Sequence, residues 1–194
     1  MEHTVSSEPK PKLTPQEYLS IERKAEIRSE YLDGEMFAMP GAQRGHNLIV
    51  VNLATELSTQ LIDRPFEVYA ADMRTKVSST GLYTYPDIVV ISGEPRFEDD
   101  YVDTLLNPTV IIEVLSASSE SYDRGRKFAQ YRAIDSLQEY LLVSQYECRI
   151  ERFARQSDGN WTFSDCTSPE GSVNLESIAC RLSVSRVYHK VNFE

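Results

Sequence analysis

The chain contains two short apolar runs that each carry a single acid, YPDIVVI at residues 85–91 and TVIIEVL at residues 109–115. Branched aliphatic residues in short runs bounded by turn-forming residues predict buried β-strands. An ionised carboxylate in such a strand is costly unless another group compensates its charge. If the two strands are neighbours, Asp87 and Glu113 can share one hard cation such as Mg²⁺, which prefers carboxylate, water and phosphate oxygens.

Each of these acids also has a purely structural interpretation. Asp87 can accept a hydrogen bond from a turn N–H at the start of its strand, and Glu113 can be a buried glutamate paired with an arginine. If the acids do bind a metal, the backbone carbonyl of Val114 is a further candidate ligand. The residues by themselves leave both interpretations open.

Composition limits the class of protein. With 194 residues, of which 41% are hydrophobic and 26% charged, the chain fits one soluble globular domain. No apolar run approaches the ~18 residues of a membrane span, and the N-terminus lacks the hydrophobic segment of a signal peptide. These features predict a cytoplasmic protein with no membrane partner. The three cysteines are odd in number and widely spaced, which argues against a disulfide framework and a clustered zinc site.

The net charge of −10 argues against a general nucleic-acid binder, because phosphate recognition uses clustered lysines and arginines. Residues 122–132 are a local exception, with four basic side chains and one acid: Arg124, Arg126, Lys127, Arg132 and Asp123. The glycines form no phosphate-binding loop, and there is no G-x-S-x-G sequence. Both observations argue against nucleotide-dependent enzymes and serine hydrolases.

The N-terminal part of the chain has clear start signals. Residues 1–13 are polar and contain two prolines, which predicts a flexible tail before a single domain at residues 14–194. The sequence TPQE at residues 14–17 combines an N-cap threonine, a proline in the first turn and a glutamate three residues after the cap. It therefore predicts a helix that ends near residue 24.

A hairpin and a long helix are predicted next. Residues 29–39 read as two strands joined by a tight turn at Asp33 and Gly34. Residues 45–63 have the apolar period of an amphipathic helix. Its buried positions are Ile49, Leu53, Leu57 and Leu61.

The rest of the chain alternates between strand and helix signals. Strands are predicted at residues 66–70, 73–78, 83–91, 109–115, 139–144, 148–154 and 160–166. A helix is predicted at residues 122–134. Residues 92–107 are acidic and read as a solvated connection, and the amphipathic remainder to Glu194 is assigned no element. This order predicts an α/β (α+β) domain with a mixed β-sheet flanked by helices.

Several of these residues resemble a known family. The landmarks are ordered along residues 30–153: Pro86-Asp87, Glu113-Val114-Leu115-Ser116, Asp123 to Lys127 with Tyr131, and EYLLV at residues 139–143. They resemble the Uma-type restriction endonucleases, a branch of the PD-(D/E)xK nuclease superfamily. The resemblance implies a restriction-endonuclease-like fold, here with an extra N-terminal hairpin and C-terminal strands. It also implies Mg²⁺, with Mn²⁺ as a possible substitute, bound by Asp87 and Glu113.

One position departs from the superfamily pattern. The pattern has lysine two residues after the glutamate, on the same face of the strand, and this chain has Leu115 there. The resemblance implies that a neighbouring element supplies the ammonium, and Lys127 is the best candidate because it shares a helical face with Asp123 and Tyr131. Lys76 is the reserve candidate. The alternative for Lys127 is a solvated surface lysine paired with Asp123.

Further candidates carry weaker signals. Glu30 resembles the N-terminal acid that many superfamily members add to the metal shell, and its alternative is a glutamate on the hairpin surface. His46 is a candidate to contact substrate phosphate, or else a local hydrogen-bonding residue. Tyr131 is a possible additional site residue, and Asp72 is a weaker one. Four tyrosines are candidates either for stacking on bases or for packing: Tyr18, Tyr31, Tyr83 and Tyr85.

Two functions follow from these patterns. The first is a Mg²⁺-dependent endonuclease that hydrolyses DNA phosphodiester bonds by attack of a metal-activated water, with Asp87, Glu113 and Lys127 in its site. The alternative is a catalytically inactive nuclease-fold domain that acts as a protein-interaction or regulatory module, consistent with Leu115 and the acidic composition. A homodimer is expected for the nuclease, because two active sites would cut two strands.

Overall fold

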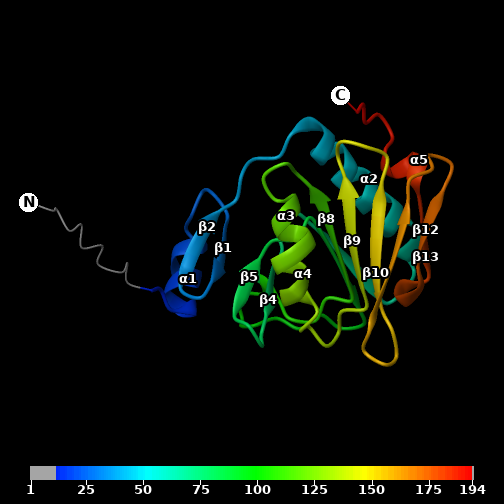
Figure 1. Ribbon diagram of the computed structural model, residues 1–194. Helices are drawn as coiled ribbons and strands as arrows, with labels where there is room; N and C mark the ends of the chain where they lie inside the picture. Colours follow the sequence, from blue (N-terminus) through cyan, green and yellow to red (C-terminus); the bar gives the residue numbers. More distant parts are fainter. Residues whose placement is uncertain (1–11, 194) are drawn as a thin grey trace, which may run out of the picture.

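The computed structural model describes residues 12–193 (Figure 1). The predicted tail at residues 1–13 lies outside these residues except for its last two. Leu13 is part of the folded domain, because its N–H donates to the carbonyl of Gly34 at 2.9 Å and its own carbonyl accepts from the hydroxyl of Tyr31 at 2.7 Å.

The larger sheet holds six strands in the order β11-β10-β9-β8-β6-β3. Their bounds are Phe66–Ala70 for β3, Ile88–Ser92 for β6, Val110–Leu115 for β8, Glu139–Ser144 for β9, Ile150–Arg155 for β10 and Trp161–Cys166 for β11. Only β8 and β9 pair in parallel, and the other neighbours are antiparallel. A parallel pair needs a crossover connection, and the helical residues between β8 and β9 provide it.

The smaller sheet has the order β2-β1-β5-β4-β7. Its strands are β1 (Ser29–Leu32), β2 (Glu35–Ala38), β4 (Arg74–Val77), β5 (Leu82–Thr84) and β7 (Thr104–Leu105). Helix α1 (Pro15–Glu22) starts at the predicted capping box of Thr14 and buries Tyr18 against this sheet. The strand predicted at residues 83–91 is wrong as one element, because it divides into β5 in the smaller sheet and β6 in the larger one. The break contains Pro86, which has no N–H for a strand ladder, and it places Asp87 at the junction of the two sheets.

Helices cover both faces of the larger sheet (Figure 1). Helix α2 (Arg44–Leu61) packs on one face, and its four predicted core leucine and isoleucine positions are buried. The other face carries α3 (Glu120–Tyr122), a π-helical turn η1 (Asp123–Lys127) and α4 (Phe128–Tyr131) in place of the single predicted helix. The core on this second face includes Tyr131 and Tyr140.

The C-terminal remainder, to which the sequence assigned no element, forms a further hairpin. Strands β12 (Ser172–Leu175) and β13 (Cys180–Ser183) flank a 3₁₀ turn, η2 (Glu176–Ile178), and are followed by α5 (Val184–Val187). Their apolar side chains join the core beside α2. The predicted fold class, a mixed α and β domain with sheets flanked by helices, is confirmed.

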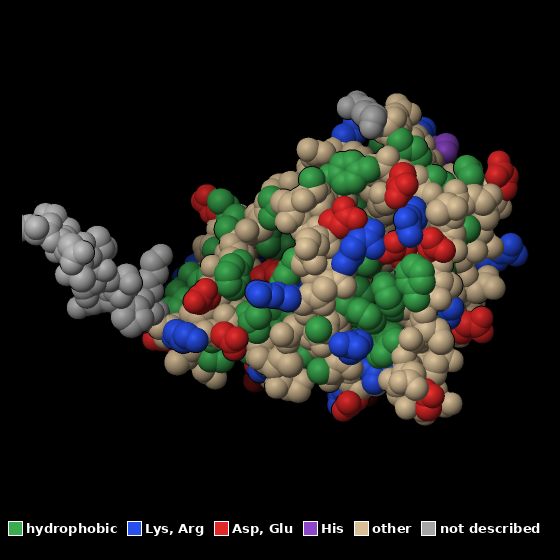
Figure 2. Space-filling view, viewed as in Figure 1, with side chains coloured by type: hydrophobic (Ala, Val, Ile, Leu, Met, Phe, Trp, Pro, Cys, Tyr) green, Lys and Arg blue, Asp and Glu red, His purple; other side chains and the backbone are tan. Residues whose placement is uncertain are grey.

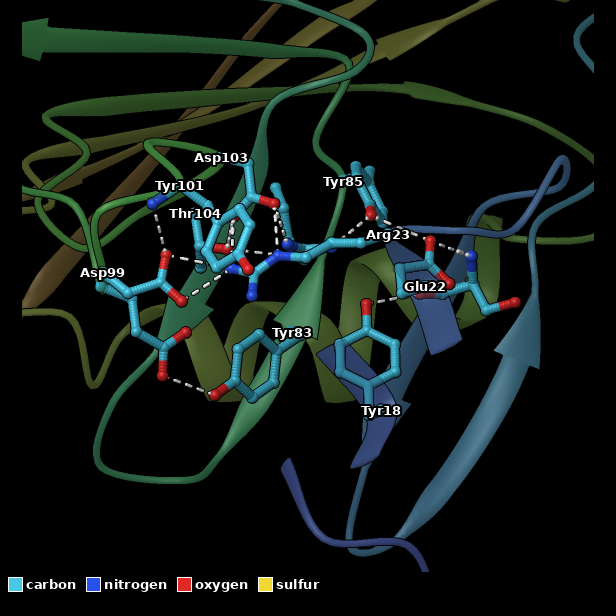
Figure 3. A network of polar contacts seen from close by, with 12 residues as sticks. Tyr18, Glu22, Arg23, Tyr83, Tyr85, Asp99, Tyr101, Asp103 and Thr104 are labelled. Atoms are coloured by element: carbon cyan, nitrogen blue, oxygen red, sulfur yellow. Dashed lines mark hydrogen bonds and ion pairs between the residues drawn. The ribbon is translucent and has the colours of Figure 1, made fainter. Parts of the chain in front are cut away.

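The acidic segment at residues 92–107 is not the solvated connection that its composition predicts. Two of its acids, Asp99 and Asp103, bind the guanidinium of Arg23 at 2.7 and 2.8 Å, and Asp103 also binds Arg74 at 2.9 Å. Arg23 stands at the end of α1, so the segment is fastened to that helix (Figure 3). No helix within residues 12–193 has the length and apolar character to cross a membrane.

Candidate active site

Lys127 carries a buried ammonium at the centre of the site. The side chain is 6% exposed, and its Nζ lies 3.0 Å from Glu30 Oε1, 3.0 Å from Glu113 Oε1 and 3.5 Å from Asp123 Oδ1. The interpretation of Lys127 as a solvated surface lysine is therefore wrong, and so is the arginine partner considered for Glu113. Lys127 and Asp123 lie in the π-helical turn η1, a local structure that is frequent at functional sites.

Five side chains from different elements, one of them Lys127 itself, form a closed polar ring. Tyr131 donates its hydroxyl hydrogen to Glu113 Oε1 at 2.8 Å, and Thr84 donates its own to Glu30 Oε1 at 2.5 Å. The two hydroxyl oxygens are 3.5 Å apart, and Lys127 links the two carboxylates from the other side. We call Glu30, Thr84, Glu113, Lys127 and Tyr131 the polar ring. It joins the smaller sheet, through Glu30 and Thr84, to the larger sheet and the crossover helices.

Asp87 lies beside the polar ring at the junction of the sheets. Its Oδ2 accepts the backbone N–H of Val114 at 2.7 Å, and its Oδ1 lies 3.2 Å from His46 Nε2. Strands β6 and β8 are neighbours, with Ile88 opposite Ile112, so Asp87 and Glu113 stand on adjacent strands and the charge of Asp87 acts on Glu113. Asp87 does accept a backbone N–H, but the donor belongs to the strand of Glu113 rather than to a local turn.

The electrostatics of the site reflect many acids around one cation. Burial raises the pKa of Glu113 to about 8, Lys127 works against this rise, and the charges of Asp123 and Asp87 add to it. Burial also raises the pKa of Asp123. Burial alone would lower the pKa of Lys127, but Glu113, Glu30 and Asp123 outweigh it and hold that pKa well above its ordinary value. Lys127 therefore stays protonated.

The donor set of Asp87 and Glu113 fits a hard divalent cation. No group of three or more His, Cys, Asp or Glu side chains among residues 12–193 is arranged to hold a metal ion. Mg²⁺ does not need such a cage, because it is commonly bound by one or two carboxylates together with waters and phosphate oxygens. The carboxyl groups of Glu30 and Asp123 lie beside the ammonium of Lys127 as well, so one fixed positive charge stands among four acidic side chains.

A hollow opens on this face of the molecule. In the space-filling view it lies between the N-terminal hairpin β1–β2 and the helices α3 and α4, and acidic atoms are visible inside it (Figure 2). This is where the elements that carry Glu30 and Lys127 face each other.

Several candidates from the sequence lie away from this cluster. Lys76 pairs with Glu98 at 2.5 Å and does not belong to the site, and Asp72 is an exposed partner of Arg28 at 3.5 Å. Three of the four tyrosines considered for base stacking are buried against one another: Tyr18, Tyr31 and Tyr83. Tyr85 is also buried, with its hydroxyl between Arg74 and Glu22. Packing is therefore the role of all four.

Sequence reasoning missed two residues of the site. Thr84 completes the polar ring, and Tyr122 lies over Lys127, with its ring centroid 5.9 Å from the ammonium. Burial, and after it the charge of Glu30, raises the pKa of Tyr122 to about 12. Tyr122 begins the basic segment in the sequence, so a closer look at that segment would have included it. Thr84 has no such signal, because only the pairing of β5 with β1 brings it to Glu30.

Comparison with known proteins gives related chains and a related fold. The chain is 39% identical over 163 residues to "Uncharacterized protein sll1609" of Synechocystis sp. (strain ATCC 27184 / PCC 6803 / Kazusa), covering 84% of this chain and 92% of that protein. It is 34% identical over 187 residues to "Uncharacterized protein slr1290" of the same organism, covering 96% and 97% of the two chains.

A crystal structure described as "a putative nuclease belonging to DUF820 from Anabaena variabilis ATCC 29413" shares the fold, with a TM-score of 0.73 and 19% identity over 91% of this chain and 97% of that one. The family described as "Uma2: Putative restriction endonuclease" matches residues 15–185. This match spans nearly all of the described residues and includes every member of the polar ring, together with Asp87 and His46. The chain therefore belongs to the Uma2 family of restriction-endonuclease-like proteins.

Proposed function

We propose that this protein is a Mg²⁺-dependent endonuclease that hydrolyses DNA phosphodiester bonds by attack of a metal-activated water. The observation that carries the proposal is the ammonium of Lys127 at 3.0 Å from Glu113, in the place of the lysine that is absent at Leu115. Family membership supports a nuclease, and the proposal adds the metal, the substrate and the residues. The position of Lys127 also favours an active enzyme over an inactive binding module, because η1 carries an ammonium that Leu115 cannot provide.

In this proposal Asp87 and Glu113 hold the metal. Each oxygen of Asp87 already takes part in one contact and retains a second lone pair for a cation. When bound, Mg²⁺ lowers the pKa of a coordinated water and offsets charge on a phosphoryl group. His46 restrains the carboxylate of Asp87, and Val114 does so through its backbone N–H. The main-chain carbonyl of Val114 remains a further candidate ligand.

Lys127 acts as a fixed positive charge. Because its pKa is held well above the ordinary value, it donates hydrogen bonds but does not remove a proton from water at neutral pH. An ammonium at this position stabilises negative charge that develops on the phosphoryl oxygens during in-line attack. Tyr131 holds Glu113 through a hydrogen bond, and Glu30 holds the ammonium through an ion pair. A homodimer, with one such site for each DNA strand, is part of the same proposal and is tested by sedimentation.

The test is Mg²⁺- or Mn²⁺-dependent nicking of plasmid DNA by the purified chain. Asp87→Asn, Glu113→Gln and Lys127→Met are expected to lose activity by at least about 10²-fold, in line with the loss of a positioned charge at a reacting centre. Lys76→Met is the matched control, because Lys76 is a lysine of the smaller sheet that lies outside the site. Nicking that survives Asp87→Asn would contradict the assignment. Absence of both nicking and calorimetric metal binding in the wild type would favour the binding module.

A further inference from the structure

Glu30 is committed to other partners on the oxygen that faces the site. Its Oε1 accepts from Thr84 at 2.5 Å and lies 3.0 Å from Lys127 Nζ. The charge of Glu30 also acts on the hydroxyl of Tyr122, whose pKa it helps to raise. The side chain of Glu30 is 12% exposed, so water does not replace these partners freely.

The ammonium of Lys127 occupies the space between Glu30 and Glu113. It lies 3.0 Å from an oxygen of each carboxylate, and a metal ion cannot share that position. The carboxylate of Asp87 lies against the strand that carries Glu113, because it accepts the backbone N–H of the adjacent residue, Val114. No third acid joins Asp87 and Glu113 in a metal-binding group within the described part of the chain.

We propose that Glu30 is a positioning residue for Lys127 rather than a metal ligand, and that Thr84 holds Glu30 in this role. The inference rests on the proposed function, because it concerns how the same site keeps its ammonium in place. Thr84, Glu30 and Lys127 form what we call the positioning arm. Thr84 is fully buried, and its β-branched side chain has few rotamers, so its hydroxyl is a rigid donor.

The positioning arm restricts the motion of a flexible side chain, that of Lys127. A lysine ammonium sits on a flexible four-carbon chain and gives no fixed direction by itself. Carboxylates on two sides, both restrained by hydroxyl donors, hold the nitrogen at one point between the two sheets. Misplacement of a catalytic group by about 1 Å is enough to cost roughly 10²-fold in rate. A hydroxyl at position 84 therefore matters to the reaction although it touches neither metal nor substrate.

The first experiment compares metal affinity with turnover in Glu30→Gln, Thr84→Val and Thr84→Ser. We expect Glu30→Gln and Thr84→Val to lower kcat by roughly 10- to 100-fold at saturating Mg²⁺. We expect the calorimetric Kd for Mn²⁺ to stay within about 2-fold of the wild type, whereas Asp87→Asn abolishes Mn²⁺ binding. Thr84→Ser keeps the hydroxyl and is expected to recover most of the rate lost in Thr84→Val. Loss of Mn²⁺ binding in Glu30→Gln would overturn the proposal, because Glu30 would then be a ligand.

Thr75 offers a matched control. It lies opposite Thr84 in the pairing of β4 with β5, it is equally buried, and its hydroxyl has no hydrogen-bond partner among the described residues. Thr75→Val makes the same chemical change on the adjacent strand and is expected to leave kcat unaltered. A loss in Thr75→Val equal to that in Thr84→Val would assign the effect to packing and would overturn the role of the hydroxyl.

A second experiment tests the arm without activity. Lys127 is buried, so an amine-acylating reagent followed by mass spectrometry should label it slowly in the folded wild type. We expect faster labelling of Lys127 in Thr84→Val and Glu30→Gln, wild-type labelling in Thr84→Ser, and no change at exposed lysines. Equal labelling in all variants would overturn the arm. If the wild type neither binds metal nor cleaves DNA, the proposed function is wrong. The labelling rate of Lys127 still decides in that case whether the positioning arm exists.

Discussion

At the scale of single residues, the site is defined by an imbalance of charge. Lys127 is surrounded by the carboxylates of Glu30, Glu113 and Asp123, all of them largely buried. Removing one partner of a buried ion pair is strongly destabilising, because it leaves an uncompensated buried charge. The ammonium therefore has a structural task as well as the proposed catalytic one, and the two can be separated by pH.

Replacing Lys127 by methionine should destabilise the fold in a pH-dependent way. Burial already raises the pKa of Glu113 from 4.5 to about 8, and without the ammonium, which opposes this rise, that pKa rises further. A raised pKa contributes stability below the unfolded value that is lost as the pH rises towards the folded value, so the additional loss in the variant lies at the alkaline end of this range. We expect a loss of about 3–5 kcal/mol near pH 8 and a smaller loss at pH 5, measured by urea denaturation.

The control for this prediction is Lys24→Met, which removes an exposed lysine just after α1. Its free energy of unfolding should stay within about 0.5 kcal/mol of the wild type at both pH values. A loss in Lys127→Met that does not change between pH 5 and pH 8 would contradict the electrostatic explanation and point to packing alone.

At the scale of elements, α1 and the segment at residues 93–107 depend on each other. Arg23 at the end of α1 binds Asp99 and Asp103, and Arg74 of β4 reaches the same Asp103. The network continues through Tyr85 and Glu22 to the hairpin (Figure 3). Because that hairpin carries Glu30, these contacts fix one wall of the candidate active site.

The pH dependence of these ion pairs can be predicted from the pKa of Asp103. The guanidinium of Arg23, assisted by Arg74 and Thr104, lowers the pKa of Asp103 below its ordinary value of 3.8. A lowered pKa contributes stability above the unfolded value and loses it as the pH falls through the folded value. Asp103→Asn should therefore be less stable than the wild type by about 1 kcal/mol between pH 5 and pH 7, the modest size reflecting a carboxyl that is a third exposed.

As the pH falls from 5 to 2.5, the gap between the two free energies of unfolding should narrow, as followed by circular dichroism in urea. Asp100→Asn is the matched control, since it removes an exposed acid from the same segment. It should differ from the wild type by less than about 0.5 kcal/mol throughout. A constant gap between Asp103→Asn and the wild type down to pH 2.5 would rule out the ion pair as its source.

Elements with a strong period were predictable from the sequence, and those set by distant contacts were not. The α2 period placed Ile49 and Leu53 in the core, and the Thr14 capping box started α1 correctly. The division of residues 83–91 between two sheets was not visible, because apolar residues continue through the break. The acids at residues 99 and 103 looked solvated because their partner, Arg23, lies far away in the sequence.

The same distinction holds within the candidate site. Asp87 and Glu113 could be named because an acid in an apolar run is a local anomaly. Their proximity follows from the pairing of β6 with β8. Thr84 could not be named, since a threonine in a short strand is ordinary and its contact with Glu30 depends on how β5 and β1 assemble. The metal-binding roles of Asp87 and Glu113 remain predictions.

At the scale of the whole molecule, the two sheets share a core as well as a site. Val77 and Leu82 of the smaller sheet pack in one cluster with Ile111 and Leu142 of the larger sheet. The polar ring bridges the same boundary. Small single domains commonly unfold in one cooperative transition, and the shared core extends this expectation to the present, larger chain. We therefore expect the sheets to lose structure together.

Leu53→Ala tests this expectation. Leu53 is fully buried in the core between α2 and the larger sheet, and its truncation should cost about 2–5 kcal/mol. The single tryptophan, Trp161 in β11, reports on the larger sheet, and the buried tyrosine cluster around Tyr83 reports on the smaller one. Fluorescence and near-UV circular dichroism should shift to the same lower denaturant midpoint.

Val51→Ala is the control on the same helix, because Val51 is 61% exposed. It should leave both midpoints within about 0.5 kcal/mol of the wild type in free energy. If the tyrosine signal of Leu53→Ala kept the wild-type midpoint while the tryptophan signal moved, the sheets would be separate cooperative units.

The members of the polar ring are synthesised at widely separated times, and its last members come late in the chain. Its members appear along the chain from Glu30 to Tyr131, and the strand that pairs with β8 on its far side, β9, follows only at Glu139–Ser144. A nascent or truncated chain that ends before Lys127 already contains Asp87 and Glu113, yet it has neither the ammonium nor the tyrosine that holds them. The site proposed for DNA cleavage is therefore complete only after the chain has passed Tyr131, and a fragment that ends earlier keeps the two acids without the groups that contact Glu113.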